Sequence, residues 1–290
     1  MLRTRCRTGL ALSALTLAAG VAALLVSTAF AGSRGAAQPG ASVRGFAALP
    51  NFVSACRFSH RATDDPIVYP GQPGASHDHS FVANTTTNAF STLTSLLAGA
   101  TTCNRPADTA AYWMPTLIVD GVPTAPLAAT IYYRRRTIAP VTAFPPDLRM
   151  IAGDARATSA QPLRVTFWNC GAAIPIAPSS TPPVCPGGRV SGLRLHVNFP
   201  SCWDGSSLDS ADHKSHMAYA LADRCPPSHP VSVPGITLIY RYPVAGEHTI
   251  ALASGGQFSG HADFVNAWKQ AELAALVQNC LNAGLRCGRF

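Results

Sequence analysis

The clearest alternation of apolar and polar positions lies between Gly192 and Phe199. Four apolar side chains occupy every second position there, and successive side chains of a strand point to opposite faces. The segment is therefore predicted to be a strand with one face in the core. Its other face carries Arg194, His196 and Asn198, so three polar groups are expected side by side.

Short apolar runs recur along the chain, and each is broken by proline or glycine. They predict further strands at residues 113–119, 128–134, 163–169 and 236–242. The proline-rich residues 144–147 and 174–186 are predicted to be loops. Many short strands joined by such turns favour a mainly β fold, either a β-sandwich or a β-rich α+β arrangement.

One segment has helical spacing instead. Apolar residues recur on one face of residues 264–281, with Asp263 as the predicted N-cap and Gly284 just past the end. The predicted fold therefore includes one C-terminal α-helix. His261 is expected just before the helix start, where the positive end of the helix dipole lowers the pKa of an imidazole.

The first 45 residues differ in pattern from the rest. Three arginines precede an apolar run and the small-residue sequence Ala29-Phe30-Ala31, which is typical of a secretory signal peptide, residues 1–31. A retained membrane anchor is the alternative, because the run is long enough to span a bilayer. Residues 32–45, rich in Gly, Ala and Ser, are expected to be a disordered leader. Residues 46–290 are expected to form a single domain without stable membrane insertion.

The cysteines support an exported protein. Nine are present, and Cys6 leaves with the signal peptide. An even number in an exported chain predicts disulfides, and no C-x-x-C motif favours a zinc–thiolate site. Many connectivities are open, and pairing nearest neighbours gives Cys56–Cys103, Cys170–Cys185, Cys202–Cys225 and Cys280–Cys287.

The charge distribution does not favour a nucleic-acid partner. The formal net charge of +8 includes the arginines of the predicted signal peptide. The one basic run, Arg134-Arg135-Arg136, ends a predicted strand, and we expect it to be solvated. The modest positive charge that remains after cleavage can aid contact with anionic polymers or surfaces, but no nucleic-acid partner is expected.

Two groups of residues could carry chemistry. His77 and His79 are two apart, so on a strand their imidazoles would share one face and could bind a divalent metal ion. A hydrogen-bonded polar loop is the alternative for this pair. The second group lies in the run HVNFPSCWDGSSLDSADHKSHMAY and, with the histidine before the predicted helix, gives the candidate catalytic residues His196, Asp204, His213, His216 and His261.

Carboxylates beside imidazoles orient the ring and raise its basicity, which suits proton transfer. Neither an EF-hand loop nor H-E-x-x-H is present, and no G-x-S-x-G elbow marks a nucleophile. For the aspartates of this run the alternative is a disulfide-anchored loop whose polar side chains bond its own backbone. The residue types therefore locate a site without naming a reaction.

Four blocks of the chain resemble one known family. They are FVSACRFSHRATDDPIVYPGQPGASHDHSFVANTTTNA, HVNFPSCWDGSSLDSADHKSHMAY, CPPSHPVSVPGITLIYRYP and HADFVNAWKQAELAALVQNCLN, between about Asn51 and Asn282. Together they resemble the DUF1996 family, secreted bacterial and fungal proteins defined as a domain of unknown function. The resemblance implies an extracellular location. Some fungal members carry sugar-binding WSC modules, which points indirectly to cell walls, although this chain has no such module.

Three functions are compatible with these observations. The first is a secreted hydrolase that acts on an extracellular or cell-wall polysaccharide through a His/Asp-rich site or a histidine-bound metal. The second is a non-catalytic carbohydrate-binding or wall-binding protein, and the third is an exported metal-binding protein. For the second, sugars would stack on an aromatic platform chosen from Trp113, Tyr132, Tyr133, Trp203 and Tyr219.

Overall fold

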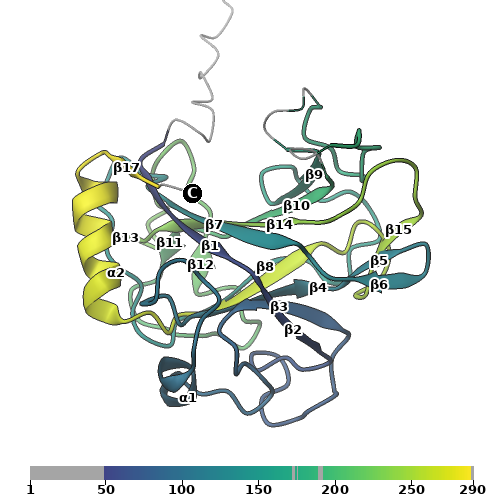
Figure 1. The fold of residues 1–290 in the computed structure, drawn as a ribbon. Helices are drawn as coiled ribbons and strands as arrows, with labels where there is room; N and C mark the ends of the chain where they lie inside the picture. Colours follow the sequence, from purple (N-terminus) through teal and green to yellow (C-terminus); the bar gives the residue numbers. More distant parts are fainter. Residues whose placement is uncertain (1–48, 172–173, 175, 189–191, 289–290) are drawn as a thin grey trace, which may run out of the picture. The chain divides into compact units, whose positions relative to one another are not determined.

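A computed structural model describes residues 49–171, 174, 176–188 and 192–288. The predicted signal peptide and the whole of the predicted leader lie outside the described residues, which belong to the compact unit Arg44–Phe290. The fold is mainly β, as predicted, with two large sheets stacked on one another (Figure 1). Among the described residues, no helix is both long enough and apolar enough to cross a membrane.

Five antiparallel strands form one of the large sheets. In spatial order they are β2 (Phe58–Ala62), β3 (His79–Ala83), β4 (Ala111–Pro115), β16 (His261–Val265) and β8 (Arg149–Gly153). Strands from distant parts of the sequence are thus neighbours, and β16 lies between β4 and β8. This order brings the segment around His79 and the segment around His261 to the same end of the sheet.

Six strands form the other large sheet. In spatial order they are β17 (Arg286–Cys287), β1 (Asn51–Cys56), β7 (Ala128–Arg134), β14 (Gly235–Arg241), β10 (Arg194–Asn198) and β9 (Thr166–Asn169). Among the described strands of this sheet, the β17–β1 pair alone is parallel. Two small sheets complete the β structure, β12 (Met217–Ala218), β11 (Cys202–Trp203) and β13 (Val231–Ser232) in one, β15 (Ile250–Leu252), β5 (Leu117–Val119) and β6 (Val122–Thr124) in the other.

The main core lies between the two large sheets. Alternate residues of each strand point into it, for example Tyr133 of β7 and Phe264 of β16, both fully buried. Tyr240 of β14 crosses the interface and donates a hydrogen bond to the carbonyl oxygen of Ser80 at 2.8 Å. The remaining residues of each strand therefore occupy the two outer faces of the sandwich, where polar side chains can gather.

The predicted C-terminal helix is present, but its start was wrong. Helix α2 (Gln270–Leu276) begins after Lys269 and continues as the π-helix η2 (Val277–Asn282), with Gly284 at a positive φ just beyond, as expected. Asp263 and Phe264, predicted to begin the helix, instead lie in strand β16, which pairs with β4 on one side and β8 on the other. Pairing on both edges satisfies more backbone groups than an extra helical turn would, so tertiary context outweighs the helical spacing. One short helix, α1 (Leu93–Ala98), was not predicted.

All four nearest-neighbour disulfides are confirmed. The pairs are Cys56–Cys103, Cys170–Cys185, Cys202–Cys225 and Cys280–Cys287. The sequence separation within a pair ranges from 7 residues for Cys280–Cys287 to 47 for Cys56–Cys103. The Cys202–Cys225 bridge anchors the loop that carries most of the aspartates and histidines of the second candidate group.

Candidate metal centre

Strand pairing brings two candidate histidines together on the outer face of the five-stranded sheet. His79 pairs with Pro115 of the intervening strand β4. On the other side of β4, Asp263 pairs with Trp113, which places His261 opposite Pro115 as well. The two imidazoles meet over this proline, with ring centroids 5.8 Å apart.

His77 supplies a third imidazole from the loop that leads into β3. Its Nε2 atom lies 3.2 Å from Nε2 of His261, and its ring centroid lies 4.1 Å from that of His79. One nitrogen of each ring lies within 4.8 Å of the other two. The structure therefore brings together His77 and His79, predicted as a metal pair, with His261, predicted as a catalytic residue.

Backbone carbonyls fix the tautomers of the two buried rings. Nδ1 of His79 lies 3.0 Å from the carbonyl oxygen of Asp64, and Nδ1 of His261 lies 2.9 Å from that of Ser259. A carbonyl oxygen only accepts, so each Nδ1 carries the proton and donates it. Each Nε2 atom then presents a lone pair, the arrangement that orients histidine toward a metal ion.

The environment keeps these imidazoles neutral. Burial lowers the pKa of His261 to about 3 and holds the pKa of His79 well below its usual range. Burial also lowers the pKa of His77, although Asp78 opposes that shift. Neutral imidazole is the form that binds a metal, so the ligands need lose no proton to bind one near neutral pH.

The distances suit a tetrahedral ion. Zinc binds histidine nitrogen at about 2.1 Å, so two ligand atoms of a tetrahedral site are about 3.4 Å apart. The His77–His261 separation of 3.2 Å is close to that value. A hydrogen bond between His77 and His261 would explain this short distance. It would not explain Nε2 of His79, which is buried and has no hydrogen-bond partner among the described residues. A cation at the centre of the cluster satisfies all three.

Asp263 places a carboxylate beside the cluster. Its side chain is 1% exposed, and Oδ2 lies 3.9 Å from Nε2 of His261. Neither carboxylate oxygen has a hydrogen-bond partner among the described residues. Burial raises the pKa of this carboxyl well above its usual range, and the nearby carboxylate of Asp65 adds to the shift. Such a group costs free energy in a protein interior unless a cation or a proton neutralises it.

His261 packs tightly against strand β8. Gly153 pairs with His261 and has φ of +82°. A Cβ atom at this position would lie 2.4 Å from the carbonyl oxygen of Gly260, so only glycine fits. The Nζ atom of Lys214 donates a hydrogen bond to the carbonyl oxygen of Gly153 at 2.7 Å. The loop containing the second candidate group therefore contacts strand β8 at the residue that pairs with His261.

The other residues of that loop do not enter the cluster. His213 contacts the carboxylate of Asp209 at 2.9 Å, and His216, 2% exposed, lies within hydrogen-bond distance of Ser210 and of the carbonyl oxygen of Arg149. Asp204 accepts hydrogen bonds from two backbone N–H groups of its own turn. These contacts are those of a loop that holds its own shape.

His196 belongs to a different part of the molecule. It lies on the outer face of the six-stranded sheet, stacked on Phe167 with ring centroids 4.2 Å apart, and lines a pocket of about 540 Å³. Arg194 and Asn198 line the same pocket, as the alternation predicted. The prediction that the basic run starting at Arg134 is solvated was wrong, because Arg134 is 5% exposed and also lines this pocket. The candidate histidines thus divide between two sites.

Sequence reasoning missed Asp263 as a site residue. The i, i+2 relation to His261 would have placed both side chains on one face of a strand, but the helical spacing that follows favoured an N-cap. A second grouping of ligand-type residues, Cys56, Cys103 and Asp108, offers no thiolate because the two cysteines are joined in a disulfide. Of the aromatic residues considered as a sugar platform, Trp113 and Tyr133 are fully buried in the interior.

The stacked sheets and the histidine cluster define a disulfide-bonded β-sandwich protein with a candidate metal centre. Residues 65–268 match the family model described as a domain of unknown function, DUF1996. The chain belongs to this family, and the matched region contains all three histidines of the cluster as well as His196. No curated protein and no solved structure matches the chain.

Proposed function

We propose that this chain is an exported metal-dependent hydrolase whose centre is the cluster of His77, His79 and His261. The observation that carries the proposal is the convergence of three neutral imidazole nitrogens within 4.8 Å beside an unsatisfied buried carboxylate. Three histidine ligands with a further open position are typical of catalytic zinc sites, whereas structural zinc sites use four protein ligands. Zinc is the first expected metal, and copper the second.

The residues have distinct roles in this proposal. The three imidazoles hold the ion, and the backbone carbonyls of Asp64 and Ser259 fix two of them in the ligating tautomer. A bound divalent ion lowers the pKa of a coordinated water and so supplies a nucleophile. Asp263 is not one of the three ligands whose nitrogens lie within 4.8 Å of one another, but it lies next to His261. From there its carboxylate could accept a proton from a water bound to the ion.

The substrate class follows from the setting of the site. The signal-like segment at the N-terminus and the four disulfides support work outside the cell. A polymer of the extracellular matrix or cell wall is the substrate most available there. We therefore propose a cell-wall or extracellular polysaccharide as the substrate, without nucleic acid as a partner.

Metal content tests the centre. Protein exported without a histidine tag and dialysed against zinc should retain about one equivalent by elemental analysis. The variants His79→Ala and His261→Ala should retain less than about a tenth of that amount, because two remaining imidazoles rarely suffice for a site. His248→Ala, which alters an exposed histidine paired with Asp120, is the matched control and should bind as wild type. Wild-type protein that holds no zinc, copper or iron after reconstitution would refute the centre.

Activity separates a hydrolase from a protein that only binds metal. On a panel of wall glycans, Asp263→Asn should keep the metal and lose about 100-fold or more in rate, because it removes the proton acceptor. His79→Ala should lose both metal and activity. A wild-type protein that holds metal but releases no product from any glycan would favour exported metal binding over hydrolysis.

A further inference from the structure

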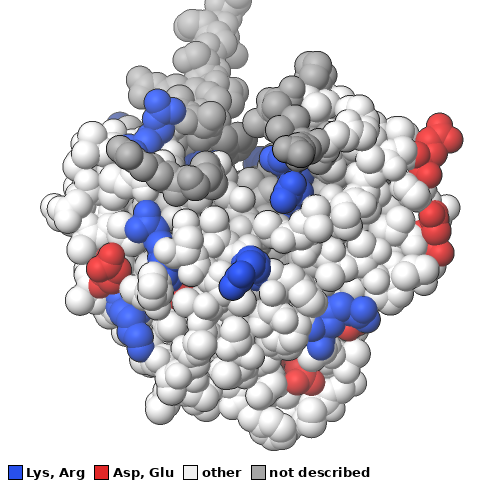
Figure 2. Space-filling view, viewed as in Figure 1, with Lys and Arg blue, Asp and Glu red and all other residues white. Residues whose placement is uncertain are grey.

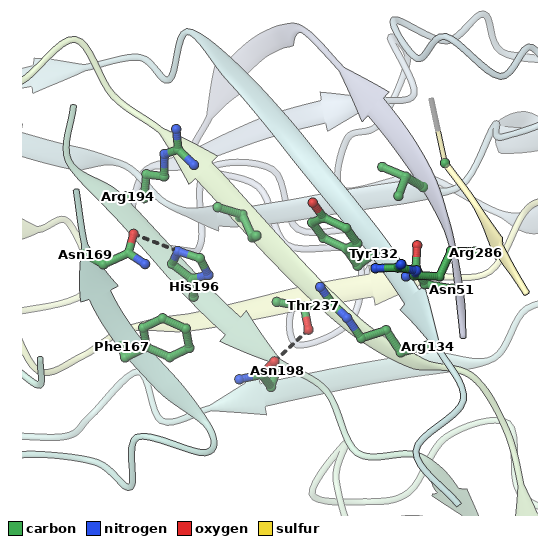
Figure 3. Close-up of a pocket in the computed structure, with 13 residues that line it drawn as sticks. Asn51, Tyr132, Arg134, Phe167, Asn169, Arg194, His196, Asn198, Thr237 and Arg286 are labelled. Atoms are coloured by element: carbon green, nitrogen blue, oxygen red, sulfur yellow. Dashed lines mark hydrogen bonds between the residues drawn. The ribbon is translucent and has the colours of Figure 1, made fainter. Parts of the chain in front are cut away.

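The pocket on the outer face of the six-stranded sheet has a lining unlike that of the histidine cluster. Four strands, β1, β7, β14 and β10, run across its floor, and β9 closes one side (Figure 3). Their alternate residues face it, while the residues between them face the core. Its volume of about 540 Å³ is the size of a site for a small ligand. Nothing in the proposed hydrolytic centre uses it.

Positive charge dominates this lining. Arg134, Arg194 and Arg286 all line the pocket, and none of the described residues of the lining is an aspartate or a glutamate. Figure 3 shows Arg194 at one side of the pocket and the other two arginines close together across it. Elsewhere charge is sparse, and the face drawn in Figure 2 has only scattered charged side chains among neutral ones. Guanidinium groups gathered in this way favour an anionic ligand.

His196 contributes a hydrogen-bond acceptor. Its Nε2 atom lies 3.0 Å from Oδ1 of Asn169, and the same oxygen accepts the backbone N–H of Gly171. Because that oxygen only accepts, Nε2 of His196 carries the proton and Nδ1 has the lone pair. Burial, together with Arg194 and Arg134, lowers the pKa of His196 to about 3, so the ring stays neutral. Its lone pair can accept a hydroxyl proton from a ligand.

Asn198 contributes a hydrogen-bond donor. Its Oδ1 atom accepts hydrogen bonds from Thr237 at 2.6 Å and from Arg136 at 3.0 Å, which fixes the amide orientation. The Nδ2 atom is then left as a donor, and it has no hydrogen-bond partner among the described residues although the residue is only 3% exposed. A buried donor in a polar pocket requires an acceptor, which a bound ligand can supply.

Aromatic rings provide the apolar part of the lining. Phe167 lies against one side of the pocket, and the Tyr132 ring supports the guanidinium of Arg134 at 3.9 Å. Val53 and Ile239 add apolar side chains to the lining, and apolar groups next to hydroxyl donors and acceptors suit the apolar face of a sugar. The lining thus combines groups for an anion, for hydroxyls and for an apolar ring face.

We propose that this pocket binds an anionic saccharide unit, in which the arginines hold the acidic group while His196 and Asn198 bind hydroxyls. The anionic part rests on the lining alone, and the saccharide part also rests on the proposed action on polysaccharide. Carboxylate, sulfate and phosphate present similar oxygen pairs to a guanidinium, so the shared chemistry is an acidic sugar. The pocket would anchor an acidic polymer to the protein at a site other than the metal centre.

Calorimetric titration of the whole exported protein tests the proposal. The ligands are trimers of a uronic acid, a sulfated sugar, a phosphorylated sugar and the matched neutral sugar. At least one acidic trimer should bind about tenfold or more tightly than the neutral one, and its affinity should fall as salt rises. Comparing the three acidic trimers with one another identifies whether carboxylate, sulfate or phosphate is preferred. Equal affinity for all four trimers, or binding to none, would overturn the proposal.

Variants locate the binding. Arg194→Gln should weaken the preferred trimer about tenfold or more, whereas Arg224→Gln, an exposed arginine outside the lining, should not. Equal loss in both variants would mean that only net charge matters and would overturn the assignment. The preference for an acidic over a neutral trimer is measured on the wild-type protein. The proposal can therefore be tested even if the Arg194 variant folds poorly. His79→Ala should bind the trimer as wild type, so failure of the metal centre and failure of this pocket are separate results.

Discussion

The two outer faces of the sandwich use one construction for opposite chemistry. On the five-stranded sheet, alternate positions present neutral imidazoles and a carboxylate, which suit a cation. On the six-stranded sheet, alternate positions present guanidiniums and amides, which suit an anion. The apolar core between the sheets separates the two sets, so neither neutralises the other. The comparison shows that the two faces of a single β scaffold can carry side-chain sets of opposite electrostatic character.

The two faces also differ in what lies next to their groups, backbone on one face and long side chains on the other. His79 and Asp263 are almost completely buried, and backbone carbonyls hold the histidine tautomers. Arg134, His196 and Asn198 of the pocket are also largely buried, but the lining comes from several strands and includes the ends of long arginine side chains. Changes near the cluster should therefore meet backbone and alter geometry, whereas changes near the pocket should meet side chains that can move.

The largest expected effect is removal of the metal. A ligand that binds only the folded state stabilises it by about 4 kcal/mol at a thousand times its dissociation constant. Adding a chelator to zinc-loaded protein should lower the free energy of unfolding in urea by about that amount. The same treatment of His79→Ala should change nothing, and trimer binding at the pocket should persist. A chelator effect of equal size in His79→Ala would place the metal elsewhere.

The next effect tests the difference in rigidity. Gly153→Ala puts a Cβ atom 2.4 Å from the Gly260 carbonyl oxygen at a positive φ, so the backbone beside His261 must shift. The expected cost is about 3 kcal/mol in urea unfolding, together with weaker zinc binding. Gly246→Ala, also at a positive φ but with nothing within 4 Å of the added atom, is the control and should cost only about 1 kcal/mol.

Gly171 is the counterpart of Gly153 on the other face. Gly171 also has a positive φ, of +106°, but a Cβ atom there would meet the guanidinium of Arg194 at 2.8 Å, which is the end of a flexible side chain and not backbone. Gly171→Ala should therefore cost less stability than Gly153→Ala, leave zinc binding intact and weaken the anionic trimer. If Gly171→Ala instead lowered zinc affinity, the two faces would not be independent.

Much of this architecture follows from the sequence, and the exceptions have physical causes. The alternation around His196 fixed which side chains share the pocket face, and the segment at residues 128–134 is strand β7 within its predicted bounds. The pairing of His77 and His79 followed from their spacing. His261 was chosen for a helix dipole that is absent, since it lies in strand β16 and burial lowers its pKa instead.

Long-range pairing could not be predicted from one sequence. Nothing local shows that β3 and β16 both pair with β4, and this arrangement alone brings His261 to His79. The same limit explains why Arg134 was expected in solvent, because a strand end is exposed only if no neighbouring strand and loop cover it. Side chains of the loop from Asp204 to His216 match the disulfide-anchored alternative, since most of their contacts lie within the loop.

Acid should destabilise the pocket face through His196. Its folded-state pKa of about 3 lies below the usual value of 6.5, so the unfolded chain binds the extra proton first. The stability from this group is complete above about pH 6.5 and is lost as the pH falls toward 3. Between pH 7 and pH 5 the loss should be about 2 kcal/mol. Urea unfolding of wild type and His196→Gln at both pH values measures it, and the variant should show a flatter pH dependence by that amount.

The smallest effect concerns the orientation of Asn198. Thr237 donates its hydroxyl to Oδ1 of Asn198 at 2.6 Å and accepts a hydrogen bond from Arg136. Thr237→Val keeps the shape but removes that hydroxyl, at a cost of about 1 kcal/mol of stability. Because Arg136 alone then holds Oδ1 of Asn198, the amide is less firmly oriented and the preferred acidic trimer should bind a few-fold more weakly, while zinc content stays at the wild-type level. A variant that binds the trimer unchanged would show that the amide is held without Thr237 and that the donor of Asn198 is fixed by the sheet itself.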